Sequence, residues 1–287
     1  MKIGVSSYSF SQLLKKGETQ LSIMKTAKDM GFDGIEFTDL NALEGLTEAQ
    51  FAEEIRNESE KLSLPVISYT VSANLLRFEE ERNDCEVERI CGKLDIAKIL
   101  GAPTLRHDTA WGFDGLDKTF KGFEQALPWL VEGSRKITNY GKKIGIVTMT
   151  ENHGYFCQDS DRVERIINGV GDPNFGALID IGNFNCADEN SLIAVGKLAP
   201  YAKHVHAKDF HIKSGNAADP GEGFFRSRGG NFLRGAIIGH GDVPVYQCIQ
   251  TLKRSGYDGF VSVEFEGMED CLTGIKIGME NLSKYVL

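Results

Sequence analysis

Four ionisable residues stand at or near the ends of apolar, β-branched runs in the second half of the chain. They are Glu151, Asp180, His206 and Glu264. Three carboxylates and one imidazole offer mainly hard oxygen ligands, which favour Mn²⁺, Mg²⁺ or Co²⁺ over a thiolate-bound zinc. Three acids in one interior would be costly without a cation, unless each were paired separately with a lysine or a helix N-terminus. The set predicts one divalent metal ion, most favourably Mn²⁺, with Mg²⁺, Co²⁺ or Zn²⁺ also compatible.

Aromatic residues near the same runs are candidates for contact with a substrate. All six histidines fall between residues 107 and 240, and most stand at or after the end of an apolar run. His153, two residues after Glu151, is expected to serve the substrate as an acid, a base or a hydrogen-bonding group. His107 is a further candidate. Trp111 could cover the apolar face of a sugar, although simple packing would explain this residue equally well.

These residues need a scaffold that gathers the ends of several strands. Short β-branched runs alternate with longer amphipathic segments, and the runs cover residues 2–6, 33–37, 64–70, 102–107, 144–151, 176–181, 202–208 and 259–265. Helices are expected at 47–62, 84–100, 118–140 and 243–255, with Thr47 (followed by Gln50) and Asp242 as start signals. Eight strand and helix pairs predict an α/β fold, a (β/α)8 TIM barrel, with residues 1–287 as a single domain. A doubly wound sheet would carry GxGxxG after its first strand, where this chain reads SSYSFSQ.

The alternation of side chains along these strands predicts which residues face the barrel interior. In the last run Val261, Val263 and Phe265 would face the helices, so Glu264 would face inward. In the run before it His206 faces inward, and His204 would be buried one layer deeper. Because active sites of such barrels lie at the C-terminal strand ends, four consecutive strands would each bring one ionisable group to the same mouth.

Composition excludes several classes of protein. The chain has 287 residues and a formal charge of −9, which argues against a protein that mainly binds nucleic acid. The first residues lack the apolar run of a signal peptide, and no run approaches the roughly 18 apolar residues of a membrane span. Six scattered cysteines without a CxxC pair favour reduced thiols and a cytoplasmic protein.

The segment between the last two runs, residues 209–240, is unusually long and rich in glycine. Long ordered loops in compact domains usually act as lids or binding loops. Phe224, Phe225 and Arg226 are poor choices for a segment that contacts only solvent. We therefore expect either a lid over the barrel mouth or a contact with another subunit.

Seven segments of the chain, in a fixed order, resemble a known superfamily. They are GFDGIEF, LGAPTLRHD, TENHG, IDIGNF, HVHAKDFH, GHGDVPV and GYDGFVSVEFEG. Together they resemble the xylose isomerase-like TIM barrel superfamily in its sugar phosphate isomerase/epimerase branch. That branch is similar to endonuclease IV, inosose dehydratase, ketose 3-epimerases and the catalytic subunits of C-glycoside deglycosidases. The resemblance implies that Glu151, Asp180, His206 and Glu264 hold the metal, and that the two glutamates exchange protons with opposite faces of the substrate.

The chain departs from the ketose epimerases at the residues expected to contact the substrate. Where those enzymes have a histidine after the strand-six aspartate, this chain has Asn183. In place of their arginine after strand seven it offers Lys208 and His211. We expect these three residues to bind the substrate, with a specificity that differs from that of a standard ketose 3-epimerase.

The leading hypothesis is a divalent-metal-dependent sugar isomerase or epimerase that removes a proton next to a carbonyl and passes through an enediolate. The alternative is a metal-dependent lyase or dehydratase acting on a keto sugar or inosose, including elimination of the C-glycoside deglycosidase type. An endonuclease IV-like nuclease and a non-catalytic subunit are less favoured. The expected substrate is a small sugar, sugar phosphate or polyol ketone, with no nucleic acid or membrane partner. A second copy of the chain or a small accessory subunit is the protein partner compatible with the long loop.

Overall fold

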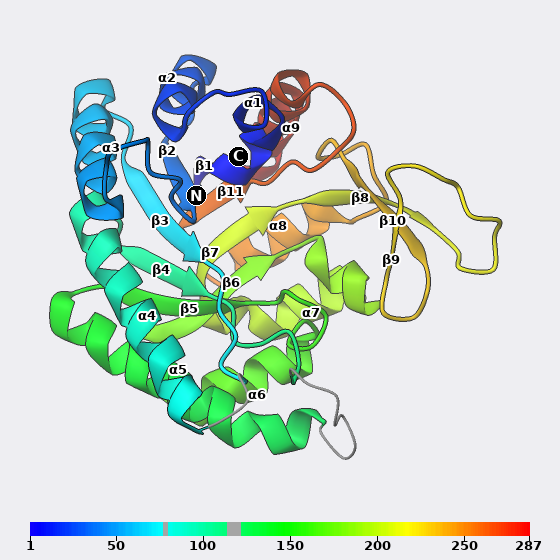
Figure 1. Ribbon diagram of the computed structural model, residues 1–287. Helices are drawn as coiled ribbons and strands as arrows, with labels where there is room; N and C mark the ends of the chain where they lie inside the picture. The colour runs from blue at the N-terminus through cyan, green and yellow to red at the C-terminus, as the bar shows by residue number, and fades with distance from the viewer. Residues whose placement is uncertain (77–79, 114–121) are drawn as a thin grey trace.

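The computed structural model describes residues 1–76, 80–113 and 122–287. Eight parallel strands close into a barrel in the order β1-β11-β7-β6-β5-β4-β3-β2 (Figure 1). Their bounds are β1 Lys2–Ser6, β2 Gly34–Thr38, β3 Val66–Val71, β4 Thr104–His107, β5 Val147–Glu151, β6 Phe175–Asp180, β7 Ala202–Ala207 and β11 Phe260–Val263. Each predicted run contains most of one barrel strand. The predicted TIM barrel is therefore confirmed.

Helices surround the barrel on its outside (Figure 1). The longer ones are α2 Gln20–Met30, α3 Glu48–Leu62, α4 Glu80–Leu100, α5 Phe123–Ile144, α6 Ser160–Val170, α7 Ser191–Leu198, α8 Val245–Arg254 and α9 Cys271–Val286. The short ones are α1 Ser11–Leu14 and the 3₁₀ turns η1 Ser7–Phe10, η2 Asn183–Ala187 and η3 Ala199–Tyr201. All four predicted helices are present, and positions 118–121 of one prediction lie outside the described residues.

The two predicted helix start signals had different outcomes. Thr47 caps α3, accepting a hydrogen bond from the Gln50 backbone N–H while the Gln50 side chain accepts one from the Thr47 backbone N–H. Asp242 was wrong as a start signal, because α8 begins after Pro244 without a side-chain cap. The Asp242 carboxylate instead accepts the backbone N–H of Ile212 at 2.7 Å. A tertiary contact therefore took the acceptor that a local cap would have used.

The alternation of side chains along the strands is confirmed. Val261, Val263 and Phe265 are buried in the apolar layer between barrel and helices. The intervening side chains point into the barrel, where Ser262 Oγ lies 2.9 Å from Nε2 of His204. Neither residue is exposed, so His204 lies in the deeper layer as expected. The barrel thus keeps its apolar packing outside the strands and its polar groups inside.

The segment expected to be a loop at 209–240 is a small antiparallel sheet, which corrects that expectation. Its strands are β8 Asp209–Lys213, β9 Phe225–Arg226 and β10 Phe232–Ala236, in the order β8-β10-β9. Pairing satisfies backbone groups that a long buried loop would leave without partners. The Asp209 carboxylate also accepts the backbone N–H groups of Gly239, Gly241 and Val243, which fixes the return of the chain. The sheet stands beside the C-terminal end of β7 (Figure 1).

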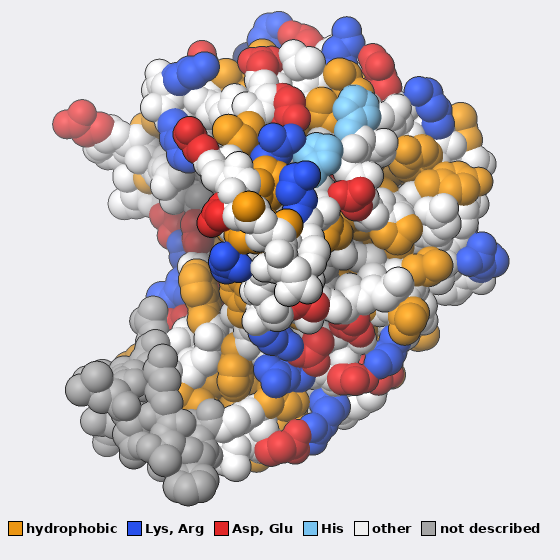
Figure 2. All heavy atoms as spheres, turned by 90° about the vertical axis from the view of Figure 1, so that its right-hand side faces the viewer, with side chains coloured by type: hydrophobic (Ala, Val, Ile, Leu, Met, Phe, Trp, Pro, Cys, Tyr) orange, Lys and Arg blue, Asp and Glu red, His pale blue; other side chains and the backbone are white. Residues whose placement is uncertain are grey.

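On the side of the molecule that bears this small sheet, acidic and basic side chains are interspersed (Figure 2). A broad basic stripe, the usual footprint of a nucleic-acid binder, is absent from the described residues visible in that view. Within residues 1–76, 80–113 and 122–287, no helix combines the length and hydropathy needed to cross a membrane.

Candidate metal centre and active site

Four side chains from neighbouring strands converge at the C-terminal mouth of the barrel. Glu151 ends β5, Asp180 ends β6, His206 lies on β7 and Glu264 directly follows β11. One potential ligand atom from each lies within 4.8 Å of the corresponding atoms of the other three. All four residues are buried. The structure therefore brings together the full predicted ligand set.

The chemistry of this cluster fits a divalent cation. Nδ1 of His206 lies 3.4 Å from Glu264, 3.8 Å from Asp180 and 4.0 Å from Glu151. That buried nitrogen has no hydrogen-bond partner among the described residues. An unpartnered imidazole nitrogen facing three carboxylates, with its other nitrogen bonded elsewhere, is the arrangement of a metal-ligating histidine. These four residues could therefore hold a cation through three oxygens and one nitrogen.

Glu36 completes the cluster from across the barrel. It lies on β2, separated from β7 by β1 and β11 in the sheet order. Its carboxylate lies 2.7 Å from Nε2 of His206 and 3.1 Å from Nε2 of His204, and it is fully buried. Burial opposes its ionisation, but the two histidines outweigh burial and lower the pKa of Glu36. An ionised Glu36 accepts the Nε2 proton of His206 and so directs the Nδ1 lone pair of that residue toward the three acids.

Lys208 and Asn183 form a second layer above the acids. Nζ of Lys208 lies 2.8 Å from Glu264 and 3.0 Å from Asp180. It also donates to Oδ1 of Asn183, whose amide donates to Glu151 at 3.0 Å. Lys208 can approach this closely because Gly182 has no side chain, and a Cβ there would lie 3.0 Å from the lysine. Lys208 and Asn183, which were both predicted to bind substrate, thus contact predicted metal ligands.

A buried chain of charges connects Glu151 to His153. Arg106 on β4 lies 2.6 Å from Glu151 and 2.7 Å from Asp108. Asp108 in turn lies 2.9 Å from Nδ1 of His153. Burial disfavours protonation of His153, but the Asp108 carboxylate outweighs it and raises the pKa of the imidazole. Since Asp108 occupies Nδ1, Nε2 is the nitrogen that His153 can offer to a substrate.

The charges at the mouth do not balance if every carboxylate there is ionised and every histidine is neutral. Five carboxylates gather there, and among the described residues the permanent cations that pair with them are Arg106 and Lys208. The carboxylates belong to Asp108, Glu151, Asp180, Glu264 and Glu266. If all five were ionised, five negative charges would face two positive ones, a deficit that protonation of a carboxyl or a histidine, or a bound cation, would offset.

The two glutamates of the cluster differ in their electrostatic surroundings. Burial raises the pKa of Glu151, an effect that the Arg106 guanidinium only partly opposes. Burial acts on Glu264 in the same sense, but His206 and Lys208 outweigh it and hold the pKa of Glu264 well below its usual value. The surroundings therefore distinguish two acids that are equivalent by residue type.

The remaining predicted substrate contacts lie in different places. Trp111 stands at the mouth, 57% exposed, with its indole N–H bonded to the Ala73 carbonyl at 2.9 Å. His107 is fully buried, stacks on Phe175 and lies behind the mouth, so the structure does not bring it to the cavities described below. His211 is on β8 in register with Arg234 of β10 and also lies outside those cavities.

Two adjoining cavities open at the barrel mouth. The metal chamber has a volume of about 180 Å³ and is lined by Tyr8, Thr38, Thr70, Arg106, Glu151, His153, Lys208, Glu264 and Glu266. The side chamber has a volume of about 490 Å³ and is lined by Trp111, His153, Gly154, Tyr155, Gln158, Asn183, Cys186, Lys208, Phe225 and Glu266. His153, Lys208 and Glu266 line both. They form a polar boundary between a charged chamber and one with aromatic walls.

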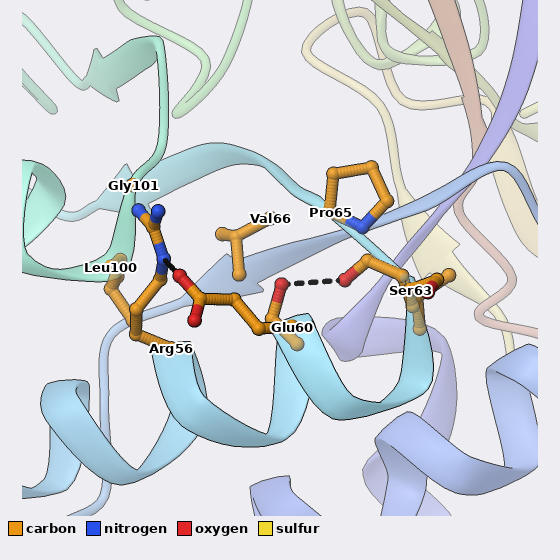
Figure 3. A pocket seen from close by; sticks show the side chains of 9 residues that line it. Arg56, Glu60, Ser63, Pro65, Val66, Leu100 and Gly101 are labelled. Carbon is orange, nitrogen blue, oxygen red and sulfur yellow. Dashed lines mark hydrogen bonds and ion pairs between the residues drawn. The ribbon is translucent and has the colours of Figure 1, made fainter.

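A third cavity, of about 390 Å³, lies at the N-terminal end of β3, away from the mouth (Figure 3). Its charged lining residues, Arg56 and Glu60, lie one turn apart on α3 and pair with each other at 2.6 Å. The charges of these two residues cancel, and the lining contains none of the clusters of potential metal ligands found among the described residues. It therefore lacks the chemistry gathered at the barrel mouth.

Sequence reasoning assigned no role to Glu36, Arg106 or Glu266. Glu36 lies between Ile35 and Phe37, and this charge in an apolar run is the signal that could have singled it out. Arg106 lies in a strand of mixed character, TLRH, which gave no such signal. Glu266 lies three residues beyond the last residue of β11. Its position on the boundary of both chambers depends on the chain path after β11.

Comparisons with known proteins agree with this architecture. Inosose dehydratase from Bacillus licheniformis is 26% identical over 167 residues, which cover 55% of this chain and 55% of that protein. The chain thus matches about half the length of its curated relatives. The 3-keto-D-glucoside 4-epimerase of E. coli superimposes with a TM-score of 0.72 at 18% identity, covering 99% of each chain. An IolI protein with a bound zinc atom superimposes with a TM-score of 0.76 at 15% identity, covering 100% of this chain and 98% of that one.

At these low identities the structural likeness establishes only the fold. The sequence match to a family model is broader, because the xylose isomerase-like TIM barrel model covers residues 24–285. With the closed barrel and the cluster at its mouth already described, this match places the protein in a family. The chain belongs to the xylose isomerase-like TIM barrel family.

Proposed function

We propose that this protein is a divalent-metal-dependent isomerase or epimerase of a small keto sugar, with Mn²⁺ as the best-suited metal. The observation that carries the proposal is the convergence of three carboxylates and an unpartnered imidazole nitrogen within 4.8 Å. A cation held there would polarise a substrate carbonyl and stabilise the enediolate formed when the neighbouring carbon loses its proton. The similarity to sugar-related enzymes of the same fold supports this choice.

Glu151 and Glu264 are the proposed proton carriers. They approach the centre from β5 and from the end of β11, with β6 and β7 between them in the sheet. A substrate seated between them would present opposite faces to the two carboxylates. One glutamate could remove the proton from one face and the other could return a proton to the opposite face, which inverts the carbon.

The neighbouring residues would position these groups and the substrate. Arg106 and Asn183 each contact Glu151, so its carboxylate is held in place on both oxygens. Lys208 contacts Glu264 and also lines both chambers, where its ammonium could bind a substrate oxygen. His153, fixed through Asp108, could donate a hydrogen bond to a substrate hydroxyl.

A lyase acting on a keto sugar or inosose is the second candidate. It would begin with the same proton removal and then expel a hydroxyl or a larger group. The sequence similarity to inosose dehydratases favours it, as does the presence of His153, Lys208 and Glu266 as potential proton donors around both chambers. Elimination changes the mass of the substrate and isomerisation does not.

The proposal is tested by incubating Mn²⁺-loaded protein with a panel of ketoses and inososes in D₂O. Mass spectrometry and NMR would report both deuterium uptake and product mass. We expect the wild type to introduce deuterium at a carbon beside the carbonyl while the carbon skeleton stays intact. Glu151→Gln should lose this uptake. Glu132→Gln is the matched control, because Glu132 is an exposed glutamate on α5.

Three outcomes discriminate between the candidates. Deuterium uptake without mass loss supports the isomerase or epimerase. Uptake followed by loss of water or of a larger group supports the lyase. Metal-loaded protein that exchanges no substrate proton contradicts both.

A further inference from the structure

The side chamber has features that a free monosaccharide at the metal centre would leave unused. Ligand pockets in proteins usually measure about 300–1,000 Å³. The metal chamber alone, at about 180 Å³, falls below that range, whereas the side chamber has about 490 Å³. The two share a boundary, so a single ligand could occupy both.

Two aromatic walls of the side chamber are exposed and yet held in place. Trp111 is 57% exposed, but its indole N–H is bonded to Ala73. Tyr155 is 42% exposed, and its hydroxyl donates to the Arg226 carbonyl at 2.9 Å. Tyr155 also has a φ of 62°, a strained left-handed conformation for a residue other than glycine. Fixed aromatic faces open to solvent are suited to stacking against a ring.

The third aromatic wall comes from the small sheet. Phe225 on β9 packs edge-to-face against Phe210, with ring centroids 5.6 Å apart. The turn that follows β9 is docked onto the body of the protein, since Arg228 pairs with Asp159 at 2.9 Å and donates to the Tyr155 carbonyl. The segment at 209–240 thus contributes Phe225 to the wall of the side chamber.

The boundary between the chambers is polar. His153, Lys208 and Glu266 line both cavities and offer hydrogen bonds at the place where a ligand would cross from one to the other. A substrate that crosses here needs a polar atom at that point, with its reactive sugar on the metal side and a ring on the aromatic side. A glycosidic oxygen between two rings meets this requirement.

Building on the function proposed above, we propose that the substrate is a glycoside. Its keto sugar would lie in the metal chamber, and the ring attached through the glycosidic bond would stack between Trp111, Tyr155 and Phe225. The attached ring can be an aromatic aglycone or a second sugar, because both present a flat face to an aromatic side chain.

Binding of unreactive ligands tests this substrate class without turnover. The Mn²⁺-loaded protein would be titrated calorimetrically with methyl and phenyl glycosides of glucose and galactose, in both anomers, and with cellobiose and maltose. At least one phenyl glycoside or disaccharide should bind about tenfold or more tightly than the methyl glycoside of the same sugar and anomer. A preference confined to phenyl glycosides identifies an aromatic aglycone, and one confined to disaccharides identifies a second sugar.

Variants locate the preference in the side chamber. Trp111→Ala and Phe225→Ala should each bring the ratio of the two affinities toward one. Trp129→Ala is the matched control, because Trp129 is 44% exposed on α5 and packs against Phe113 outside the chamber. It should keep the wild-type ratio.

The glycoside assignment is overturned if no ring-bearing ligand binds more tightly than its methyl counterpart. It is also overturned if both chamber variants keep the wild-type ratio. Because no ligand in this titration reacts, a failure of the proton-transfer chemistry would not affect the result. Deuterium exchange into free ketoses, combined with no ring preference, would reject the glycoside and keep the proposed function.

Discussion

Replacing Glu36 by glutamine is expected to weaken metal binding although Glu36 is not one of the four proposed ligands. The substitution conserves shape and removes the negative charge that lies 2.7 Å from Nε2 of His206. The glutamine oxygen can still accept a hydrogen bond from one histidine. Its NH₂ group cannot accept a hydrogen bond from the other, and the neutral side chain cannot offset a positive charge on either imidazole. His206 would then be a weaker and less firmly oriented ligand.

The size of the effect follows from the contacts of Glu36. A hydrogen bond to a charged group contributes about 1.5–3 kcal/mol. Loss of the partner behind a metal-ligating histidine typically lowers metal affinity by about 10- to 100-fold. That change corresponds to about 1.4–2.7 kcal/mol, and the two estimates agree. We therefore expect the Kd for Mn²⁺ to rise by about 10- to 100-fold in Glu36→Gln.

Calorimetric titration of Mn²⁺ into chelator-treated protein measures this Kd directly. Ser262→Ala is a neighbouring buried control, since it removes the hydrogen bond to His204 and leaves the contact between Glu36 and His206. Its Kd should stay close to that of the wild type. Thermal unfolding of each variant shows whether the barrel is intact.

The reasoning is refuted if folded Glu36→Gln binds Mn²⁺ with the wild-type Kd. Glu36 would then have only a structural role, as the hydrogen-bond partner of His206 and His204. A wild-type protein that binds no divalent metal at all would contradict the proposed centre itself.

Four further predictions follow from the same structure. Glu151→Gln and Glu264→Gln should each lower kcat by at least about 100-fold with circular dichroism unchanged, and more than a tenth of wild-type activity in both would argue against their roles. Mn²⁺ at 100 times its Kd should raise the free energy of unfolding by about 2.7 kcal/mol, measured by denaturant titration, and a chelator should reverse the gain. Burial lowers the pKa of His107 to about 4, whereas the unfolded histidine has a pKa of about 6.5. Because the unfolded state therefore binds the proton first, the free energy of unfolding should fall by about 3 kcal/mol as the pH falls from 6.5 to 4. Denaturant titration at several pH values should show this loss, and His107→Gln should reduce it. Replacing the largely exposed residues 216–222 by a short Gly-Ser link should leave KM unchanged, whereas Arg228→Ala should raise KM by loosening the wall of the side chamber, and equal kinetics in both variants would contradict that role.

Much of the fold was accessible from the sequence because each local signal agreed with the next. Eight β-branched runs alternate with amphipathic segments, and alternation within the runs separated Val261 and Val263 from Ser262 and Glu264. The small sheet at 209–240 was missed because its strands are short and pair only with one another. They lie within a single segment between two barrel strands and so do not extend the alternation of strands and helices. Asp242 was misread because the sequence does not show that Ile212 lies close enough to donate to it.

The sequence by itself determined the closed barrel and the order in which four ionisable residues reach its mouth, because strand period and strand count are local properties that add along the chain. Only the tertiary structure decided which distant groups meet these residues. Glu36 reaches His206 across the barrel interior, and Arg106 joins Glu151 to Asp108. Phe225 reaches the side chamber from the small sheet that follows β7, whereas Trp111 follows β4 and Tyr155 follows β5. Such contacts depend on barrel closure and on the path of loops, which bring together residues far apart in sequence and leave no periodic signal in the chain.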